Sequence, residues 1–459
     1  MLANSLIALD REHYVHPVSA YRAHEARGAT VLESAHGMFL RDANGHELID
    51  AFAGLWCVNI GYGHESVVEA AAAQMRKLPY ATGYFGFASE PAIRLAAKLA
   101  EISPPGLNRV FFSQGGSDAV DSAIRLITHY FNAIGQPSRK QFIALEKGYH
   151  GSSSTGAGMT ALPVFHRNFD LPRANQHHIP SPYPYRNPAG SDDAGVIAAS
   201  VAALKAKVAE LGAENVAAFF CEPVQGSGGV IVPPVGWLKA MRAATAELGI
   251  LFLADEVITG FGRTGPMFAC EAEGVTPDVM TIAKGLTAGY VPMGAVLLSD
   301  KVYAGIADGA PAEAVIGHGY TYSGHPVAAA VGLEVIRLYE SGILDNGKAV
   351  GQLFGAGLKD LERHPLVGEA RFRGMLGALE LVADKTARRP FPAEVKLADR
   401  LAANGYRNGI IFRAFADGTI GLAPALSCTD DEMEILLARL ARTLDDTLGE
   451  ADVRAALRG

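Results

Sequence analysis

A lysine and an aspartate each follow a short apolar run, where they could take part in catalysis. Lys284 comes directly after residues 279–283 (VMTIA), and Asp255 directly after residues 250–254 (ILFLA). An ammonium group at the mouth of an apolar strand is partly desolvated, which lowers its pKa and makes it a candidate Schiff-base nucleophile. A carboxylate leaving a buried strand is costly unless a cation or hydrogen-bond donors meet it. Considered singly, the lysine could be a surface residue and the aspartate a helix cap.

A glycine pair before a helical pattern indicates an anion site. After residues 109–113 (RVFFS), Gly115 and Gly116 precede a helix that would have Ser117 or Asp118 at its cap. Glycines at a helix N-terminus expose backbone N–H groups and the positive end of the helix dipole, which together can hold a phosphate. By itself the segment could also be an ordinary capped helix.

An aromatic ring and an imidazole follow another apolar run. Tyr149 and His150 come shortly after residues 141–145 (QFIAL), where each could simply be packed. Ligands of an open parallel sheet bind beyond the carboxyl ends of its strands. We therefore expect the lysine, the aspartate, the glycine cradle and the aromatic ring to surround one ligand. Pyridoxal 5'-phosphate needs each of them: a cradle for its phosphate, Asp255 on its ring nitrogen, Lys284 on its aldehyde and Tyr149 over its ring.

A mainly parallel sheet is needed to bring these groups together. Six apolar runs lack the alternation of half-exposed strands, so we expect strands buried on both faces with amphipathic helices between them. These runs are residues 109–113, 141–145, 216–221, 250–254, 279–283 and 294–298. The pattern predicts an α/β fold.

The two ends of the chain have a different pattern. Residues 30–50 predict a small antiparallel hairpin, and the part after residue 330 predicts a long helix, three short strands and a final helix. We therefore expect an N-terminal segment over 1–60 that contributes to a small α+β domain, a large cofactor-binding domain over 61–329, and the C-terminal small domain over 330–459.

Several segments resemble those of one enzyme family. Residues 255–265 (DEVITGFGRTG), followed by TIAKG at 281–285, resemble the signature of the class III pyridoxal-phosphate aminotransferases. GYHG at 148–151, EPVQG at 222–226 and HGYTYSGHP at 318–326 are further resemblances, which together extend over nearly the whole chain. Residues 50–63 (DAFAGLWCVNIGYG) are similar to the ω-amino acid:pyruvate and amine:pyruvate transaminases.

This resemblance implies the type I aminotransferase fold and a homodimer, or a tetramer, with shared active sites. The implied reaction is ping-pong transfer of an amino group from an ω-amino acid or primary amine to pyruvate through a Lys284 Schiff base, with Lys284 and Asp255 catalytic. The implied cofactor-binding residues are Gly116, Ser117, Tyr149, His150, Glu222, Asp255, Val257, Lys284 and, for the neighbouring subunit's cofactor, Thr321. The implied substrate-binding residues are Trp56, Tyr84, Phe85, Tyr149 and Arg413.

Two positions depart from the family pattern. Gly115 stands where the phosphate loop usually has serine, so we expect backbone N–H groups to bind more of the phosphate. Ser227 stands where relatives that use 2-oxoglutarate commonly have a glutamate that pairs with the arginine. Arg413 would lack that partner, which favours pyruvate as the acceptor, with 2-oxoglutarate as the alternative.

Composition and the remaining motifs disfavour other classes of protein. Forty Lys+Arg against 48 Asp+Glu give a formal charge of −8, so no nucleic-acid partner is expected. No HExxH or GxSxG is present, and no metal is expected. GFGRTG at 260–265 matches GxGxxG, but the strand does not lead directly into its first glycine, which disfavours a nucleotide-dependent dehydrogenase. A non-catalytic binding module is disfavoured because Lys284 and Asp255 are both present.

Targeting signals are also lacking. We find no signal peptide and no apolar stretch long enough to span a membrane, and four dispersed cysteines indicate reduced thiols. A cytoplasmic enzyme is therefore expected, with a small-molecule amine donor and a keto acid acceptor and without a membrane partner. The pattern does not specify the amine.

Overall fold

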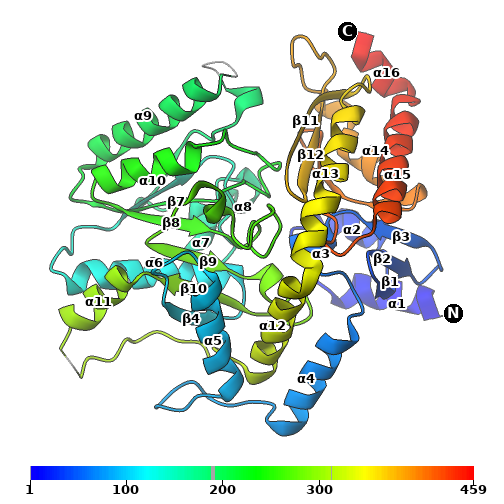
Figure 1. Cartoon of the computed structure of the whole chain (residues 1–459). Helices are drawn as coiled ribbons and strands as arrows, with labels where there is room; N and C mark the ends of the chain where they lie inside the picture. Colours follow the sequence, from blue (N-terminus) through cyan, green and yellow to red (C-terminus); the bar gives the residue numbers. More distant parts are fainter. Residues whose placement is uncertain (1, 188–191, 312, 459) are drawn as a thin grey trace.

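A seven-stranded sheet lies in the larger half of the computed structural model, which describes residues 2–187, 192–311 and 313–458 (Figure 1). The strand order is β4-β10-β9-β8-β7-β5-β6, and β10 is antiparallel to both of its neighbours while the other pairs are parallel. The strands are β4 (Arg109–Ser113), β5 (Gln141–Leu145), β6 (Gln176–Ile179), β7 (Val216–Cys221), β8 (Leu251–Asp255), β9 (Val279–Ile282) and β10 (Gly294–Leu298). All six predicted strands are present within one residue of their expected bounds, and the α/β class is confirmed. Edge strand β6 was not predicted because its sequence, QHHI, is polar.

Helices cover both faces of this sheet, so its strands are buried on both sides. On one face α6 (Gly116–Ala133) and α11 (Asp300–Gly309) share a core with Val279 and Val296. On the other face Met280 and Ala295 pack with α5 (Glu90–Ile102) and α12 (Pro326–Leu338). Helices α9 (Asp193–Leu211) and α10 (Trp237–Glu247) continue that second layer over β7 and β8.

Two four-stranded sheets are built from the ends of the chain. The predicted hairpin is an antiparallel sheet of β1 (Leu32–His36), β2 (Phe39–Asp42) and β3 (Glu47–Asp50), and β13 (Ile410–Ile411) adds to β3 in parallel. The second sheet has the order β11-β12-β15-β14, from β11 (Val367–Arg373), β12 (Leu376–Leu381), β15 (Thr419–Leu422) and β14 (Arg413–Ala414). Strand β13 therefore joins the two ends of the chain.

The C-terminal helices cover these small sheets. They are α13 (Leu344–Leu361), α14 (Leu397–Arg407), α15 (Asp430–Leu448) and α16 (Ala451–Arg458). Helices α12 and α13 run end to end through a kinked turn, Tyr339–Ile343, in which Gly342 has φ +128° (Figure 1). The boundary expected at residue 330 falls inside α12, so the division of the chain into domains stays a prediction.

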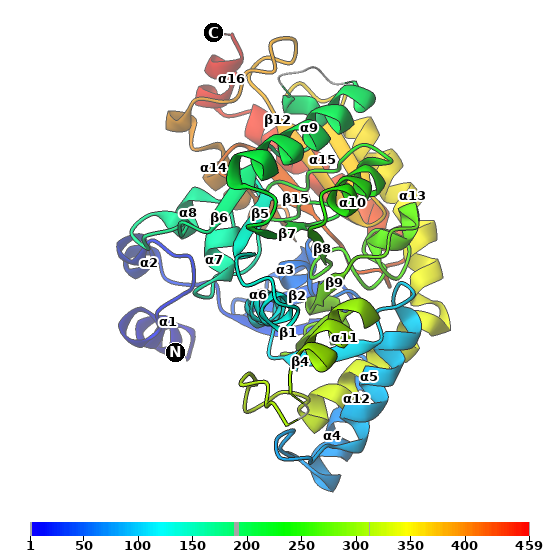
Figure 2. The ribbon, with the colours of Figure 1, turned by 90° about the vertical axis from the view of Figure 1, so that its left-hand side faces the viewer.

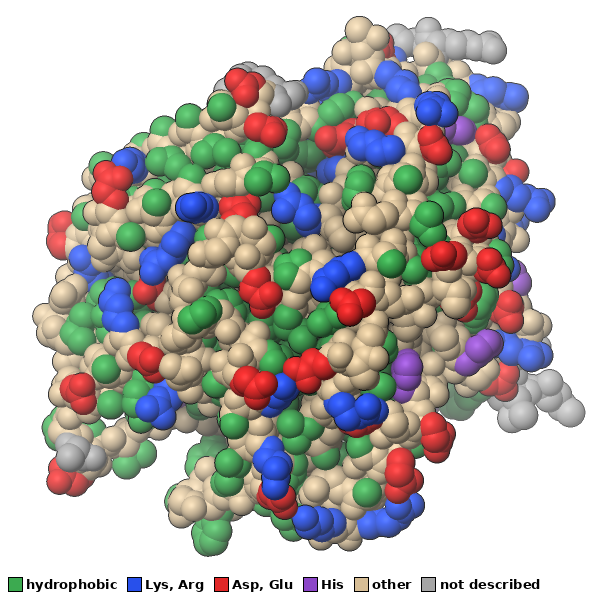
Figure 3. Space-filling model, viewed as in Figure 1, with side chains coloured by type: hydrophobic (Ala, Val, Ile, Leu, Met, Phe, Trp, Pro, Cys, Tyr) green, Lys and Arg blue, Asp and Glu red, His purple; other side chains and the backbone are tan. Residues whose placement is uncertain are grey.

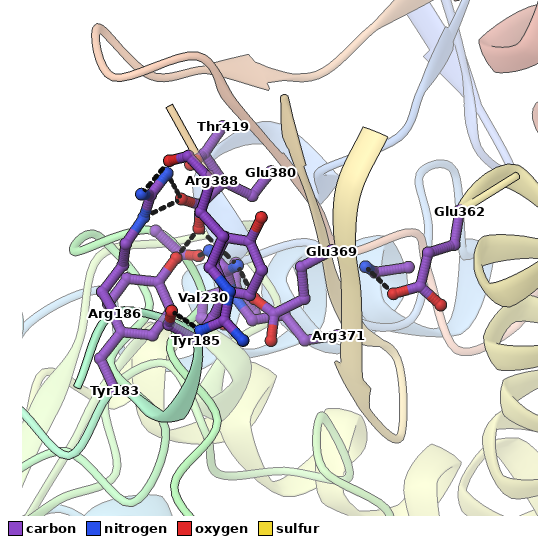
Figure 4. Close-up of polar contacts among 12 residues, drawn as sticks. Tyr183, Tyr185, Arg186, Val230, Glu362, Glu369, Arg371, Glu380, Arg388 and Thr419 are labelled. Carbon is purple, nitrogen blue, oxygen red and sulfur yellow. Dashed lines mark hydrogen bonds and ion pairs between the residues drawn. The ribbon is translucent and has the colours of Figure 1, made fainter. Parts of the chain in front are cut away.

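A buried polar network fastens β11 and β12 to the loops after β6 and β7 (Figure 4). Glu380 of β12 accepts hydrogen bonds from the hydroxyl of Tyr183, from Arg186 Nε at 2.7 Å and from Arg371 Nη1 at 3.0 Å. Arg371 also donates to the carbonyl oxygens of Val230 and Gly229 at 2.9 and 2.6 Å. Because a buried ion pair is costly to break, these contacts hold the sheet of β11, β12, β15 and β14 in a fixed position beside the large sheet.

The remaining helices are short or lie at the edge of the molecule. They are α1 (Leu2–His13), α2 (Tyr21–Arg27), α3 (Ala53–Trp56), α4 (Glu65–Lys77), α7 (Gly156–Met159) and α8 (Pro163–His166). None of the described helices combines the length and the apolar run that crossing a bilayer requires. On the face shown in Figure 3, basic and acidic side chains are interspersed, which differs from the continuous basic surface typical of nucleic-acid binding.

Candidate active site

Lys284 and Asp255 lie at the ends of adjacent parallel strands, as predicted. Asp255 is the last residue of β8, with its side chain only 4% exposed, and Lys284 begins a short 3₁₀ turn after β9. Burial lowers the pKa of the Lys284 ammonium group, and the negative charge of Asp255 opposes that shift. The neutral amine, which is the nucleophilic form of lysine, therefore forms more readily at this position than in water.

His150 lies behind Asp255 and is completely buried. Its Nδ1 is 2.8 Å from Asp255 Oδ2, and the backbone N–H of Val257 donates to Asp255 Oδ1 at 3.2 Å. Burial alone would lower the pKa of His150, but the hydrogen bond and the charge of Asp255 outweigh it and raise that pKa. The buried imidazole thus holds the Asp255 side chain in a fixed position.

Glu222 holds the loop that carries Tyr149. One oxygen of its carboxylate accepts from the backbone N–H of Tyr149 and the other from that of Gly226, both at 2.9 Å. Burial, with Asp255 nearby, raises the pKa of Glu222 to about 7. Since both oxygens bind backbone within the protein, this geometry gives Glu222 a positioning role, while the ring of Tyr149 packs against Phe165 with centroids 5.3 Å apart.

Helix α6 begins where the sequence predicted it, at the glycine pair. The helix begins at Gly116, and Gly115 at its N-cap position has no side chain to cap it, so the first N–H groups are available to an anion. A Cβ on Gly116 would lie 2.9 Å from Val257 Cγ1, whereas a Cβ on Gly115 would meet no atom within 4 Å. Gly116 is thus needed for close packing under the site, and Gly115 is not.

Trp56 lies beside the lysine on a strained turn. The centroid of its ring is 6.0 Å from Lys284 Nζ, and its indole nitrogen is buried without a hydrogen-bond partner in the described part of the chain. The turn contains positive φ angles at Ala53 (49°), Gly54 (70°) and Trp56 itself (57°). Such strain persists only where surrounding contacts impose it, and it is typical of functional sites.

Asp50 supplies those contacts. Its carboxylate accepts from the backbone N–H groups of Gly54 at 2.6 Å and Phe52 at 3.3 Å, and from the hydroxyl of Tyr62 at 2.7 Å. Sequence reasoning did not single out Asp50 or Tyr62, although both lie in the quoted segment 50–63. The aspartate therefore acts on the pocket by positioning Trp56.

Arg413 lies against the ring of Phe415, which packs beside Trp56. The two rings form an aromatic wall, and Phe415 was not identified from the sequence. The ring of Phe415 stacks near Trp56 with centroids 6.4 Å apart, and Arg413 Cζ lies 5.3 Å from the Phe415 centroid. Among the described residues, no carboxylate forms an ion pair with Arg413. Its guanidinium thus lies against the Phe415 ring without an acidic partner in the described part of the chain.

Thr321, Tyr84 and Phe85 lie together elsewhere on the surface. The hydroxyl of Tyr80 donates to the carbonyl of Thr321 at 3.0 Å, and a Cβ on Gly319 would lie 2.6 Å from the Tyr84 hydroxyl oxygen. Phe85 is 91% exposed. No contact of these residues with Lys284 or Asp255 is found within the described part of this chain, so its fold does not bring them to that site.

Comparison with known proteins places this arrangement among transaminases. The profile of the family described as aminotransferase class-III matches residues 20–444. The chain is 42% identical over 444 residues to a putrescine–pyruvate aminotransferase from Pseudomonas aeruginosa, covering 96% of each chain. It is 37% identical over 448 residues to a diaminobutyrate–2-oxoglutarate transaminase from Halomonas elongata, again covering 96% of each.

Solved structures have the same fold. A thermostable (S)-enantioselective omega-transaminase from Thermomicrobium roseum superposes with a TM-score of 0.94 at 40% identity, over 97% of this chain and 99% of that one. The omega-transaminase from Pseudomonas jessenii in complex with PMP has a TM-score of 0.94 at 36% identity, over 97% and 98%.

Proposed function

The chain belongs to the class III aminotransferases, and on that basis we propose that it transfers the amino group of an ω-amino acid or another primary amine to pyruvate, giving alanine and an aldehyde or ketone. Its cofactor is pyridoxal phosphate, and its fold is that of the type I aminotransferases. The convergence of Lys284, Asp255 and the N-terminus of α6 at one edge of the sheet carries the proposal.

The residues present fit this cofactor. The N–H groups at the start of α6, with Gly116 and Ser117, would hold its phosphate, and Val257 and Tyr149 would lie against its ring. Asp255 would face the ring nitrogen. When bound, pyridoxal phosphate supplies an aldehyde that bonds to amines and a ring that withdraws electrons from the carbon being deprotonated.

Proton transfer is the contribution of the protein. Lys284 Nζ, with its pKa lowered by burial, would take the proton from the reacting carbon of the substrate and deliver it, on the same face, to the adjoining carbon of the cofactor. Asp255, held in place by its 2.8 Å contact with His150, would keep a proton on the ring nitrogen. Trp56 and Phe415 would exclude water from this side of the pocket.

The acceptor is selected around Arg413. Its guanidinium would bind the carboxylate of pyruvate in one half-reaction, and the aromatic wall would receive an amine without a carboxylate in the other. Ser227 in place of an acidic residue supports pyruvate, as does the similarity to a putrescine–pyruvate aminotransferase. 2-Oxoglutarate remains the alternative acceptor, which the similarity to a diaminobutyrate–2-oxoglutarate transaminase favours.

A homodimer with shared active sites would complete the pocket. Tyr84 and Phe85 are exposed, and Thr321 has no contact with Lys284 within the described part of the chain, which supports a role for all three at the site of a second subunit. A cytoplasmic location stays a prediction, supported by four unpaired cysteines. The proposed domains are the segment 1–60, the cofactor-binding part over 61–329 and the C-terminal part over 330–459.

The decisive experiment is a panel of donors assayed with two acceptors. β-Alanine, putrescine, 6-aminohexanoate and an aryl-alkyl amine would each be incubated with pyruvate or with 2-oxoglutarate, and alanine and glutamate would be quantified. We expect alanine to form with at least one donor and kcat/KM for pyruvate to exceed that for 2-oxoglutarate. Glutamate as the main product would refute the acceptor, and no amino transfer with any donor would refute the reaction.

A further inference from the structure

Three side chains that could bind a metal meet in the N-terminal helical hairpin. Asp10 on α1, His16 in the connecting loop and His24 on α2 bring one ligand atom each within 4.8 Å of the others. Asp10 Oδ1 is 2.5 Å from His16 Nε2, and Asp10 Oδ2 is 2.8 Å from His24 Nε2. Figure 2 shows α1 and α2 side by side at the edge of the molecule.

This hairpin has no apolar core of its own. No residue between 6 and 27 is fully buried, and the large apolar side chains of the connecting loop face solvent, with Tyr14 61%, Val15 71% and Val18 66% exposed. The side chains of Asp10 and His24, in contrast, are only 11% and 12% exposed. Small units that cannot bury enough apolar surface are commonly held together by a disulfide or a metal ion.

Asp10 lies between the two histidines and contacts each of them through a different carboxylate oxygen. Its Oδ2 is 2.8 Å from His24 Nε2, and both of these atoms are buried. Buried charged groups are costly unless they are paired or coordinate a metal ion. One ligand atom from each of Asp10, His16 and His24 thus lies within 4.8 Å of the other two, which is close enough for a single ion to contact all three.

We propose that Asp10, His16 and His24 bind a divalent transition-metal ion, with zinc as the best match, and that this ion fastens α1 to α2. Imidazole nitrogen and carboxylate oxygen are ordinary zinc ligands, and three protein ligands leave one position for water. Zinc–ligand bonds of about 2.0–2.1 Å separate tetrahedral ligands by about 3.3 Å. The two pairs would thus open by less than about 1 Å, and the proton shared by Asp10 and His16 would be released.

The site is independent of the proposed transamination, and the sequence did not reveal it. We expected no metal because the sequence has no HExxH, and Asp10, His16 and His24 were not singled out. Only the hairpin brings the three together.

Zinc binding by the full-length holoenzyme, without an affinity tag and after removal of metals by a chelator, tests the proposal. Zinc would be titrated in competition with a chromophoric chelator. We expect about one tight site per chain, absent from Asp10→Asn and from His24→Gln. His13→Gln is the matched control, because His13 lies on the same helix with its side chain 64% exposed, and it should bind zinc like the parent.

Hydrogen exchange supplies a second measurement that does not depend on activity. Zinc should slow amide exchange in residues 2–27 of the parent and of His13→Gln at least several-fold, and should leave His24→Gln and Asp10→Asn unchanged. Cofactor absorbance and the melting temperature would verify that each variant is folded. Absence of a stoichiometric site, equal binding by all four proteins, or zinc binding without protection of residues 2–27 would each overturn the proposal.

Discussion

Replacing Gly115 with serine should tighten the binding of pyridoxal phosphate. Gly115 stands at the position where the phosphate loop of the family usually has serine. Its backbone is extended, with φ −177° and ψ −172°, a conformation that any residue adopts, and a Cβ there meets no atom within 4 Å. Serine therefore fits without strain and adds a hydroxyl donor at the N-terminus of α6.

The size of the effect follows from the charge of the phosphate. A hydrogen bond to a charged group contributes about 1.5–3 kcal/mol. Because about 1.4 kcal/mol corresponds to a factor of ten, the dissociation constant of the cofactor should fall at least about tenfold. Serine is also a slightly better N-cap than glycine, by a few tenths of a kcal/mol.

The assay is a titration of the apoenzyme with pyridoxal phosphate, followed by absorbance or protein fluorescence. Gly115→Ala separates the hydroxyl from any stiffening of the backbone and should not reproduce the gain. Gly116→Ser is the opposite control, because its Cβ would lie 2.9 Å from Val257 Cγ1 and should displace that residue and weaken binding. If Gly115→Ser binds no more tightly than Gly115→Ala, the hydroxyl does not reach the phosphate and the reasoning is refuted.

Three other substitutions test the remaining parts of the site. Lys284→Ala should lower alanine formation by at least about 10⁴-fold while the cradle still retains the cofactor, and a kcat within tenfold of wild type would contradict its role. Arg413→Ala should raise the KM for pyruvate about tenfold or more. The half-reaction with a simple amine should change little, which single-turnover rates can measure. Equal losses in both half-reactions would exclude selective binding of the carboxylate. Burial raises the pKa of Glu222 from 4.5 to about 7, so the stability that it contributes is present below pH 4.5 and is lost as the pH rises through 7. Between pH 5 and pH 8 the unfolding free energy of the apoenzyme should thus fall by about 2.5 kcal/mol relative to that of Glu222→Gln. Urea denaturation at each pH measures this difference. If the unfolding free energies of the two proteins change with pH in parallel, the pKa of Glu222 is not raised and the prediction is wrong.

The large sheet and the residues at its strand ends were predictable because they follow local rules. A strand buried on both faces is a continuous apolar run, and the carboxyl ends of parallel strands meet at one edge. Lys284, Asp255 and Gly116 were identified in this way, and the structure places each where a strand ends or a helix begins. Edge strand β6 was missed because QHHI has the pattern of neither strand nor helix.

Contacts between distant parts of the chain were not predictable in this way. Asp50 holds the turn of Trp56 through two backbone N–H groups, which no periodicity reveals. Phe415 follows β14 in one small sheet, and Trp56 follows β3 in the other, so their contact depends on how the two sheets pack. The network around Glu380 fixes the sheet that contains β14 beside the large sheet.

The amino-acid sequence by itself therefore determined the chemistry: an amine, a carboxylate and an anion cradle at strand ends, and the family to which they belong. The tertiary structure decided how these groups are supported and which residues surround them, including the pocket wall and the unanticipated cluster of Asp10, His16 and His24. The physical reason is that burial and strand direction are encoded by neighbouring residues. A side-chain contact across the fold depends on the packing of elements that are far apart in the chain.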